Sequence, residues 1–509
     1  MKVRPVVLLL PVTLLLAVGL LSLLPDNLLV SALGSTHRRL LDLFGPLYSV
    51  VVPAGLLLLF VIYHSPLGRL TIGGPQAEPV LSKPAWFLIV LCTTVAAGIL
   101  FWATAEPVWH FNAPPDGSME ARSPAASSFA MSTLFLHWTF LPYSLYCVSG
   151  LMFAICYFNL GQPFHAGSTL RPILGERVTR RLSPWIDGVC LFSLTAGIAA
   201  SMGSALLTLG GGFDRFMEGS DKSQVLGWMA LLITLTMGVS AASGLLRGIK
   251  ALSYINAFGF LVLILWVSAF APWSILVPRT GTAVAEFFAT ILPRSLSIGM
   301  DQGWSENWTV FYWSNWLAWT PITAVFLGRL GRGYTVRTFI RFNLIYPSLF
   351  SVCWLSLFGG YALSIDEQSG ELNRALQTDG PESVIFQVFD TMPLATISSL
   401  FFLLVVFLSF VTSGDSLVSA MSGLTTRDIS ERKEEAPAAI KFVWAGVIGL
   451  TSWFMVRYIG LDGIRIVSNL GGFPALVLYV MVLLGLIRLL WKRSSDLTDT
   501  GERPTADGT

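Results

Sequence analysis

Four tryptophans fall within the segment 308–319, and their side chains could bind a positively charged group. Trp313, Trp316 and Trp319 are spaced by three residues, so on a helix they share one broad face. The faces of aromatic rings attract cations, and a quaternary ammonium group suits them because it has no N–H to satisfy. The spacing therefore favours an aromatic cage for such a cation. An interfacial belt that packs helices together is the alternative, and both interpretations stay open on residue type alone.

Polar or helix-breaking residues interrupt the apolar background at further places. The segment 92–98 is rich in small and hydroxyl residues, which allow either close helix packing or an unwound turn that faces a ligand. Pro142 frees a backbone carbonyl within a predicted helix, which needs a packing or functional reason. Asp415 lies inside an apolar segment, where a carboxylate is either functional or hydrogen-bonded to another helix. His137 is interpreted as a packed or interfacial residue, not as a metal ligand or base.

The composition indicates that these residues lie in a membrane protein. The chain has 509 residues, of which 54% are hydrophobic and 12% charged, and its mean hydropathy is +0.68. A soluble protein could not bury that much apolar surface, and many runs reach the roughly 20 residues that cross a bilayer. We therefore predict an all-α polytopic membrane protein with about twelve transmembrane helices. The predicted spans are 1–25, 46–64, 86–106, 131–157, 187–210, 226–246, 250–279, 306–330, 339–363, 393–424, 438–458 and 464–491.

The sequence argues against several other classes of protein. It contains no nucleotide-binding fingerprint and no metal-binding histidine pair on a helix. Its five cysteines fall inside predicted helices without the spacing of a metal site or disulfide framework. A membrane enzyme would need clustered acids, a metal site or a nucleophile with its base, whereas the acids and His137 are isolated in sequence. We therefore expect no enzyme activity, no cofactor and no nucleic-acid partner, and a small molecule and membrane lipids as partners.

The distribution of charge between the spans predicts the orientation. Arginine and lysine gather in the loops that follow the even-numbered spans, whereas acidic residues dominate most of the opposite loops. Under the positive-inside rule both termini are cytoplasmic, in a bacterial-type plasma membrane. The segment 283–297 is too short for a confident span and is expected to be an amphipathic helix on the surface. The polar residues 492–509 are expected to form a disordered tail.

Taken together, five stretches resemble the betaine/carnitine/choline transporter family, and they occur in the same order as in that family. The run of Trp, Thr, Phe, Tyr and Trp that begins at Trp308 is the most specific of them. The stretches are Phe101 to Pro107, His137 to Tyr146, Trp308 to Trp319, Arg329 to Gly333 and Phe410 to Ser416.

This resemblance implies a leucine-transporter-like fold with two inverted repeats of five helices, preceded by two extra helices. It also implies a substrate site midway across the membrane at the repeat interface, and a homotrimer, as in many members. The corresponding regions are 1–84 for the two N-terminal helices, 85–279 for the first repeat, 280–305 for an amphipathic connection, 306–491 for the second repeat and 492–509 for the cytoplasmic tail.

The resemblance also assigns candidate substrate-binding residues. Asn315 stands where many members have tryptophan, and it adds hydrogen-bonding groups that suit either a substrate with an extra polar group or a reshaped exit. Tyr143 also stands where many members have tryptophan, but it keeps an aromatic face. The aromatic box takes Trp138, Tyr143, Tyr146 and Trp316, with Trp313 and Trp319 along the path to it.

A second set of residues corresponds to a sodium site in sodium-coupled members. In those members, backbone carbonyls of the third span and two hydroxyl groups hold the ion. The matching positions here are Cys92 and Val95 for the carbonyls and Thr412 and Ser413 for the hydroxyls. Oxygen atoms of both kinds suit a hard cation. The third span is nevertheless closer to the sodium-independent exchangers, in which a positive side chain fills this position. Lys250 is the first candidate for that role and Arg247 the second, with snorkelling at the cytoplasmic interface as the alternative for both.

The expected function is therefore secondary active transport. The chain would import a quaternary-ammonium or sulfonium compound such as glycine betaine, choline or carnitine through alternating access. Sodium or protons would drive the import, with Na⁺ as the candidate coupling ion. The alternative is an ion-independent exchanger of substrate for product. A channel is disfavoured, because an aromatic cage favours binding over free conduction.

Overall fold

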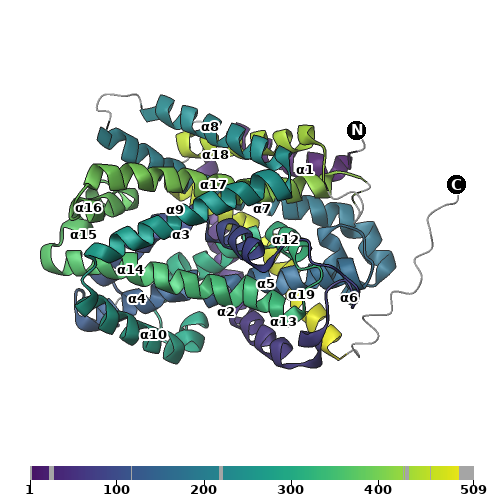
Figure 1. The fold of residues 1–509 in the computed structure, drawn as a ribbon, viewed down its shortest axis with the longest axis horizontal. Helices are drawn as coiled ribbons and strands as arrows, with labels where there is room; N and C mark the ends of the chain where they lie inside the picture. Colours follow the sequence, from purple (N-terminus) through teal and green to yellow (C-terminus); the bar gives the residue numbers. More distant parts are fainter. Residues whose placement is uncertain are drawn as a thin grey trace.

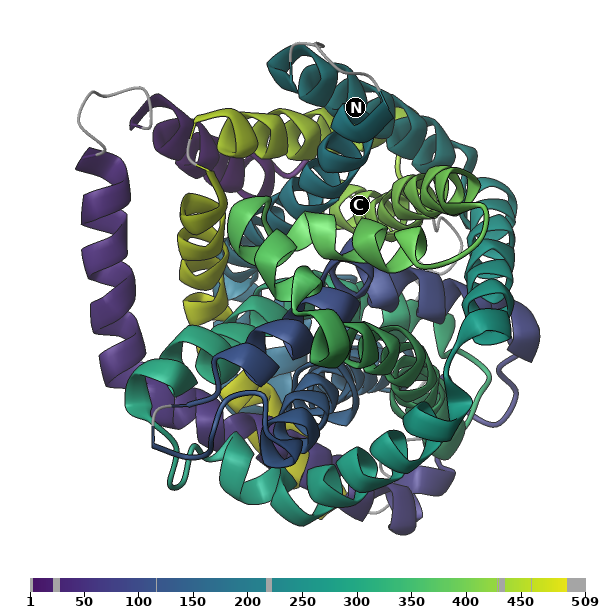
Figure 2. The same cartoon turned by 90° about the vertical axis from the view of Figure 1, so that its left-hand side faces the viewer.

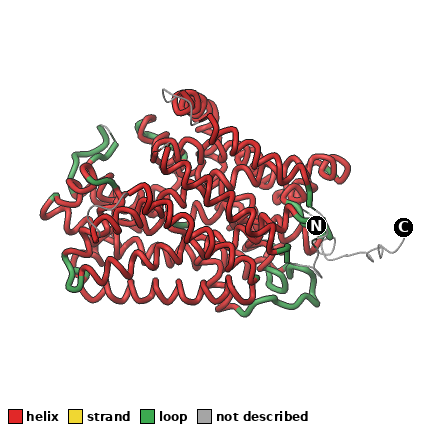
Figure 3. Tube along the Cα trace, turned by 90° about the horizontal axis from the view of Figure 1, so that it is seen from above, coloured by secondary structure: helices red, strands yellow, loops and turns green. Residues whose placement is uncertain are grey.

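The computed structural model describes residues 3–21, 28–115, 117–216, 222–427, 429, 435–458 and 460–491, and the predicted tail 492–509 lies outside them. The described residues form an all-helical bundle without a β-strand, in which long helices run side by side (Figures 1 and 3). By length and composition, ten described helices can cross a membrane, or eleven if the two halves of one bent helix count as a span. The predicted all-α membrane class is confirmed, and each predicted span overlaps helical segments over most of its length. The count is lower than the twelve predicted, because the first predicted span is described as a shorter apolar helix and Phe311–Leu330 is not among the ten, whereas Trp273–Ser295 is.

The long helices fall into an N-terminal pair and two sets of five, and part of α2 lies at the periphery of the bundle in Figure 2. The pair is α1 (Pro5–Leu21) and α2 (Leu28–His64). The first set is α3 (Lys83–Asn112), α4 (Pro124–Trp138) with α5 (Phe140–Ala154), α7 (Glu176–Phe216), α8 (Lys222–Ser243) and α9 (Lys250–Phe270). The second set is α12 (Phe311–Leu330), α14 (Tyr346–Ser369), α17 (Ala395–Thr425), α18 (Ala438–Tyr458) and α19 (Gly460–Leu490).

Further helices connect these elements. They are α6 (Arg171–Leu174), α10 (Trp273–Ser295), α11 (Gln302–Ser305), α13 (Val336–Ile340), α15 (Glu371–Thr378) and α16 (Val384–Asp390). A π-helical turn, Glu306–Val310, leads directly into α12.

The contacts between the two sets are matched in pairs. The contact of α3 with α14 corresponds to that of α12 with α5, and the contact of α3 with α17 corresponds to that of α12 with α7. The contact of α8 with α17 likewise corresponds to that of α18 with α7. The two sets therefore repeat one pattern of contacts, which is typical of a transporter built from two related five-helix repeats.

Lipid-facing and protein-facing residues separate clearly on these helices. Phe60 on α2, Trp228 on α8 and Phe258 on α9 are 66%, 70% and 65% exposed, as expected for side chains that contact lipid tails. By contrast, Trp313 on α12 is completely buried. The tryptophan-rich helix therefore lies inside the bundle, and most of its tryptophans are not a lipid-facing belt.

The end of the seventh predicted span differs from the sequence prediction, which extended it to residue 279. Helix α9 ends at Phe270, and a separate helix, α10, begins at Trp273. The cause is Pro272, which disfavours a helical conformation at the preceding residue; Ala271 is accordingly extended, with ψ of 138°. The connection between the two sets thus begins earlier than residue 280. The segment 283–297, predicted to be too short for a span, lies mostly within α10, which has 23 residues and is one of the described helices that can cross a membrane. The homotrimer and the cytoplasmic termini stay predictions.

Two interruptions in the helices position the residues described below. In α3, the segments Lys83–Val95 and Gly98–Asn112 meet at an angle of 55°. Between α4 and α5, Thr139 leaves the helical conformation, with φ of −123° and ψ of −120°. The bend in α3 falls in the segment rich in small and hydroxyl residues, and the break at Thr139 falls three residues before Pro142. Both places were singled out in the sequence as possible interruptions.

Candidate functional site

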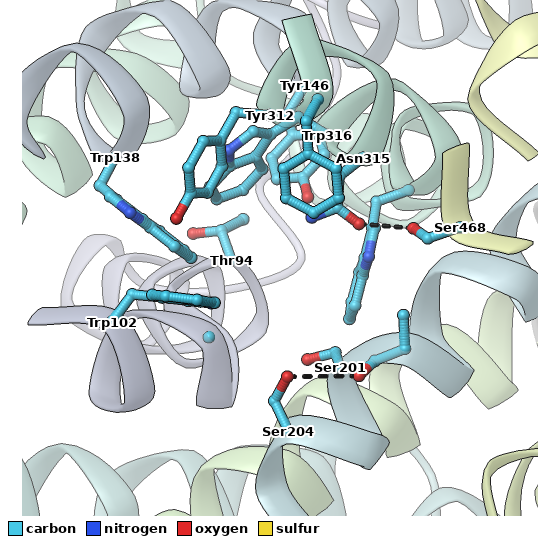
Figure 4. A pocket seen from close by; sticks show the side chains of 14 residues that line it. Thr94, Trp102, Trp138, Tyr146, Ser201, Ser204, Tyr312, Asn315, Trp316 and Ser468 are labelled. Carbon is cyan, nitrogen blue, oxygen red and sulfur yellow. Dashed lines mark hydrogen bonds between the residues drawn. The ribbon is translucent and has the colours of Figure 1, made fainter. Parts of the chain in front are cut away.

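A cavity of about 70 Å³ lies between helices of the two sets (Figure 4). It is bordered by α3, the α4–α5 pair, α7, α12 and α19. Among the described residues that line it, none carries a charged side chain. They are Thr94, Gly98, Trp102, Trp138, Tyr146, Ala200, Ser201, Ser204, Phe311, Tyr312, Asn315, Trp316, Trp319 and Ser468.

One end of the cavity is aromatic. The ring of Trp316 lies 5.4 Å from that of Trp138 and 5.5 Å from that of Tyr146, both in edge-to-face contact. The indole N–H of Trp316 donates to the backbone carbonyl of His137 at 3.0 Å, which fixes the orientation of the ring. The ring of Tyr312 lies 5.3 Å from that of Trp138. Several ring faces and edges therefore converge at one place, as a cation site requires.

Gly98 explains why Trp138 can reach this place. A Cβ atom at Gly98 would lie 2.9 Å from the indole of Trp138, which is closer than side chains tolerate. The absence of a side chain on α3 thus leaves room for the ring, directly after the bend at Val95.

The rest of the cavity wall includes uncharged polar groups. The hydroxyl of Ser468 donates to Asn315 Oδ1 at 2.6 Å. Ser204 donates to the carbonyl of Ala200 at 3.4 Å, and Ser201 lies beside it. Figure 4 shows this hydroxyl-bearing stretch of α7 across from the rings of Trp138 and Trp316. The cavity therefore combines an aromatic surface with neutral hydrogen-bonding groups.

The structure brings most of the predicted substrate residues together. Trp138, Tyr146, Asn315, Trp316 and Trp319 line the cavity. The other two predicted residues lie close by without lining it. The ring of Tyr143 is 6.2 Å from that of Trp316, and its hydroxyl is 3.0 Å from that of Ser351. Trp313 is buried, with its ring 6.1 Å from His137.

Several lining residues were not predicted. Trp102 and Tyr312 lie within the stretches that carry the family resemblance, so that resemblance contained a signal for them. Ser201, Ser204 and Ser468 are single small polar residues in apolar helices, and nothing in the sequence separates them from other such residues.

A buried polar cluster lies behind the aromatic wall. Glu106 accepts hydrogen bonds from Trp138 Nε1 at 2.8 Å and from the Tyr312 hydroxyl at 2.6 Å, both at Oε2. Its Oε1 lies 2.6 Å from His137 Nδ1 and 3.5 Å from His110 Nε2. His137 is therefore packed, as predicted, but it is one member of a cluster that the sequence separation concealed.

The cluster does not require a metal ion. The candidate ligand atoms of Glu106, His110 and His137 all lie within 4.8 Å of one another. However, the hydrogen bond with His137 and the two donors on the other carboxylate oxygen hold Glu106 in place, and His110 lies near it because it is four residues later on the same helix. We assign no metal to these residues.

The predicted cation residues also come together, at the contact of α3 with α17. The hydroxyl of Ser413 donates to the carbonyl of Thr93 at 3.0 Å, and Thr93 donates to Ser416 at 3.0 Å. The hydroxyl of Thr412 donates to the carbonyl of Leu408 at 2.9 Å. Val95 and Cys92 are buried on α3, and α3 contacts α17. Oxygen atoms of the kind that bind Na⁺ are therefore concentrated here.

Helix α9 contributes different residues to this region from the one predicted. The amide of Asn256 donates to the Thr412 hydroxyl at 3.3 Å, and Cys92 Sγ donates to the carbonyl of Ser253 at 3.3 Å. Lys250 is the first residue of α9, about one helical turn before Ser253. No hydrogen bond joins the described Lys250 side chain to Thr412 or Ser413. An amide, not an ammonium group, lies next to the predicted cation residues.

Asp415 is hydrogen-bonded to a neighbouring helix and to its own. Its carboxylate accepts from Ser240 on α8 and from Ser416 at 3.3 Å. This arrangement matches the alternative in which an intramembrane carboxylate holds two helices together.

Comparisons with known proteins identify the family of the chain. The chain matches the family model for betaine/carnitine/choline transporters over residues 6–495. A glycine betaine transporter of Vibrio parahaemolyticus is 30% identical, with 82% of this chain and 80% of that protein covered. A glycine betaine transporter of Bacillus subtilis is 26% identical, over 93% of this chain and 91% of that protein.

The high-affinity choline transport protein of Escherichia coli is 27% identical, over 99% of this chain and 75% of that protein. A solved Na⁺-coupled sialic acid symporter has a TM-score of 0.49 and 17% identity, covering 86% of this chain and 85% of that one. The family match extends over nearly the whole chain, from α1 to α19. The chain belongs to the betaine/carnitine/choline transporter family, whose named members here are membrane transporters and not enzymes.

Proposed function

We propose that the protein is a secondary active transporter that imports a quaternary-ammonium or related sulfonium compound. The observation that carries this proposal is the convergence of Trp138, Tyr146 and Trp316 in a cavity between the two helix sets. A trimethylammonium group placed among these rings gains up to about 2 kcal/mol when desolvated there. Transport proteins with inverted repeats bind their substrates at this interface and expose it alternately to the two sides.

The cavity wall supports a proposal about the rest of the substrate. A carboxylate buried there without a counter-charge would lose much of its hydration energy, and none of the described lining residues is charged. Asn315, Ser468 and Ser201 instead offer neutral donors and acceptors. We therefore infer that an alcohol such as choline suits the site better than a zwitterion such as glycine betaine.

The energy source is proposed to be a cation gradient, with Na⁺ as the first candidate. Its support is the group of oxygen atoms at Thr412, Ser413 and the carbonyl of Thr93. One observation favours the alternative, an ion-independent exchanger: the amide of Asn256 donates to the Thr412 hydroxyl. An amide N–H at this position would take the place that a cation needs next to the hydroxyl oxygen.

Uptake into proteoliposomes tests the proposal and separates the alternatives. Radiolabelled choline, glycine betaine and carnitine are offered with and without an inward sodium gradient, and with and without unlabelled substrate inside. We expect choline to accumulate only with the sodium gradient. Uptake that ignores sodium but needs internal substrate would establish the exchanger. Failure to bind or transport any of the three compounds would refute the quaternary-ammonium site.

A further inference from the structure

Glu106 is a buried carboxylate whose hydrogen bonds connect it to two rings of the cavity wall. Its side chain is completely buried on α3. Trp138 and Tyr312 both line the cavity, and both donate to the same oxygen, Oε2. The carboxylate therefore lies directly behind the aromatic surface, one ring away from the space that we assign to the substrate.

The hydrogen bonds indicate that Glu106 is ionised. The indole N–H of Trp138 can only donate, so Oε2 acts as an acceptor. At Oε1, His137 satisfies its two ring nitrogens if Nδ1 donates to Glu106 and Nε2 accepts from the Thr309 hydroxyl at 3.1 Å. This pattern describes a neutral imidazole beside a carboxylate. Three donors converge on an anion, as charge-assisted hydrogen bonds require.

The charge of this anion is not balanced by a lysine or arginine. Its ion-pair partners in the described structure are the histidines His110 and His137. Neither nitrogen of His110 has a hydrogen-bond partner, and its ring packs 4.4 Å from that of Trp308. The positive Arg294 on α10 is paired with Glu286 and bonds Ser132 at 2.7 Å. With neutral histidines, the cluster retains one uncompensated negative charge inside the membrane, which is costly.

We propose that Glu106 is the buried counter-charge of the substrate's ammonium group and determines the preference of the site for cations. This inference rests on the proposed quaternary-ammonium site. A carboxylate at the N–H edge of Trp138 and at the hydroxyl of Tyr312 pushes electron density into both rings, which strengthens their attraction for a cation on the cavity side. It also attracts the cation directly across a medium of low dielectric constant. The substrate's charge in turn compensates Glu106.

The test compares a charged ligand with a neutral ligand of the same shape. Choline and 3,3-dimethyl-1-butanol, in which a tert-butyl group replaces trimethylammonium, are used as competitors for binding to the purified full-length protein in detergent. Glu106→Gln keeps the volume and a hydrogen-bond acceptor but removes the charge. We expect choline affinity to fall by about tenfold or more, while the affinity for the neutral alcohol changes by less than about twofold.

A purely structural role would give a different result. If Glu106 only holds Trp138 and Tyr312 in place, Glu106→Gln will weaken both ligands in the same proportion, and the counter-charge is refuted. Glu106→Asp keeps the charge and should keep the preference for choline. Glu306→Gln removes a carboxylate near the start of α12 that bonds Gln302 at 2.8 Å, and serves as the control that leaves the ratio unchanged.

A second variant keeps the test decisive if Glu106→Gln does not fold. Trp138→Phe preserves an aromatic face but removes the N–H that links the ring to Glu106. The ratio of choline to alcohol affinity should then fall severalfold, and an unchanged ratio would contradict the proposal. If the wild-type protein binds neither choline nor glycine betaine, the proposed function fails first and the counter-charge fails with it.

Discussion

The aromatic cavity and the α3–α17–α9 contact, here called the cation region, occupy two different contacts between helix sets. In the cavity, Trp316 of the second set packs against Trp138 and Tyr146 of the first through ring contacts. In the cation region, Ser413 and Thr412 join α17 to α3 and α9 through hydrogen bonds. The first region recognises by shape and ring electrostatics, and the second by the orientation of dipoles. They should therefore respond to different ligands and different mutations.

The largest effect is expected when the shared ring of the cavity is removed. Trp316→Ala deletes the ring that contacts both Trp138 and Tyr146, so a cation–π face and the packing around it are lost. We expect affinity for the quaternary-ammonium substrate to fall by about a hundredfold, measured by isothermal titration calorimetry. Trp228→Ala, on the exposed face of α8, should leave affinity unchanged. Normal affinity in the Trp316 variant would exclude this ring from the site.

The cation region should change ion dependence while substrate contacts stay intact. The double variant Thr412→Val with Ser413→Ala removes two hydroxyl oxygens. We expect the sodium concentration for half-maximal uptake to rise by about tenfold or more, with little change in sodium-free substrate binding. Ser399→Ala, a buried hydroxyl of α17 without a hydrogen-bond partner, is the matched control. If the sodium dependence of uptake is the same in wild type and double variant, these hydroxyls do not bind the coupling ion.

The close contact between α3 and the cavity wall gives a third test. Gly98→Ala would place a methyl group 2.9 Å from the indole of Trp138 and so displace the ring. We expect about a tenfold loss of substrate affinity by the same calorimetric measurement. Gly446→Ala is the control, because a Cβ atom there meets nothing within 4 Å. Equal affinities for the two glycine variants would mean that the position of Trp138 is not critical.

The two regions also differ in how far the sequence predicted them. Spans and aromatic residues could be predicted, because apolar runs define membrane helices and the tryptophan spacing marks one helix face. Thr412 and Ser413 were predicted from the resemblance. Asn256 was not, because its role depends on which face of α9 meets α17, and this is set by tertiary packing. Lys250 attracted attention through its charge, whereas the hydrogen bonds from α9 to this region are made by Asn256, to Thr412, and by the carbonyl of Ser253, to Cys92.

Glu106 and His137 show the same limit more clearly. They are 31 residues apart in sequence and lie on different helices, so the spacing within either helix does not reveal their hydrogen bond. Only His110, four residues after Glu106 on the same helix, is a partner that the spacing could have indicated. The contact between Glu106 and His137 exists because α3 packs against α4. The spacing of residues within one helix predicts which of them share a face. Which polar residues of two helices meet depends on how the helices are rotated relative to each other, and spacing does not predict that. The aromatic residues of the cavity were therefore predicted more completely than Glu106 and His137, which lie behind them.

The smallest expected effect separates the two kinds of recognition within the cavity itself. Asn315→Leu keeps the approximate volume of the side chain but removes the amide that accepts from Ser468. Because the aromatic surface is unchanged, binding of tetramethylammonium should change by less than about twofold. Binding of choline should fall by about fivefold, the effect of losing roughly one hydrogen bond, as measured by competition against radiolabelled substrate. An equal loss of affinity for both ligands would show that Asn315 shapes the cavity and does not form a hydrogen bond with the polar end of the substrate.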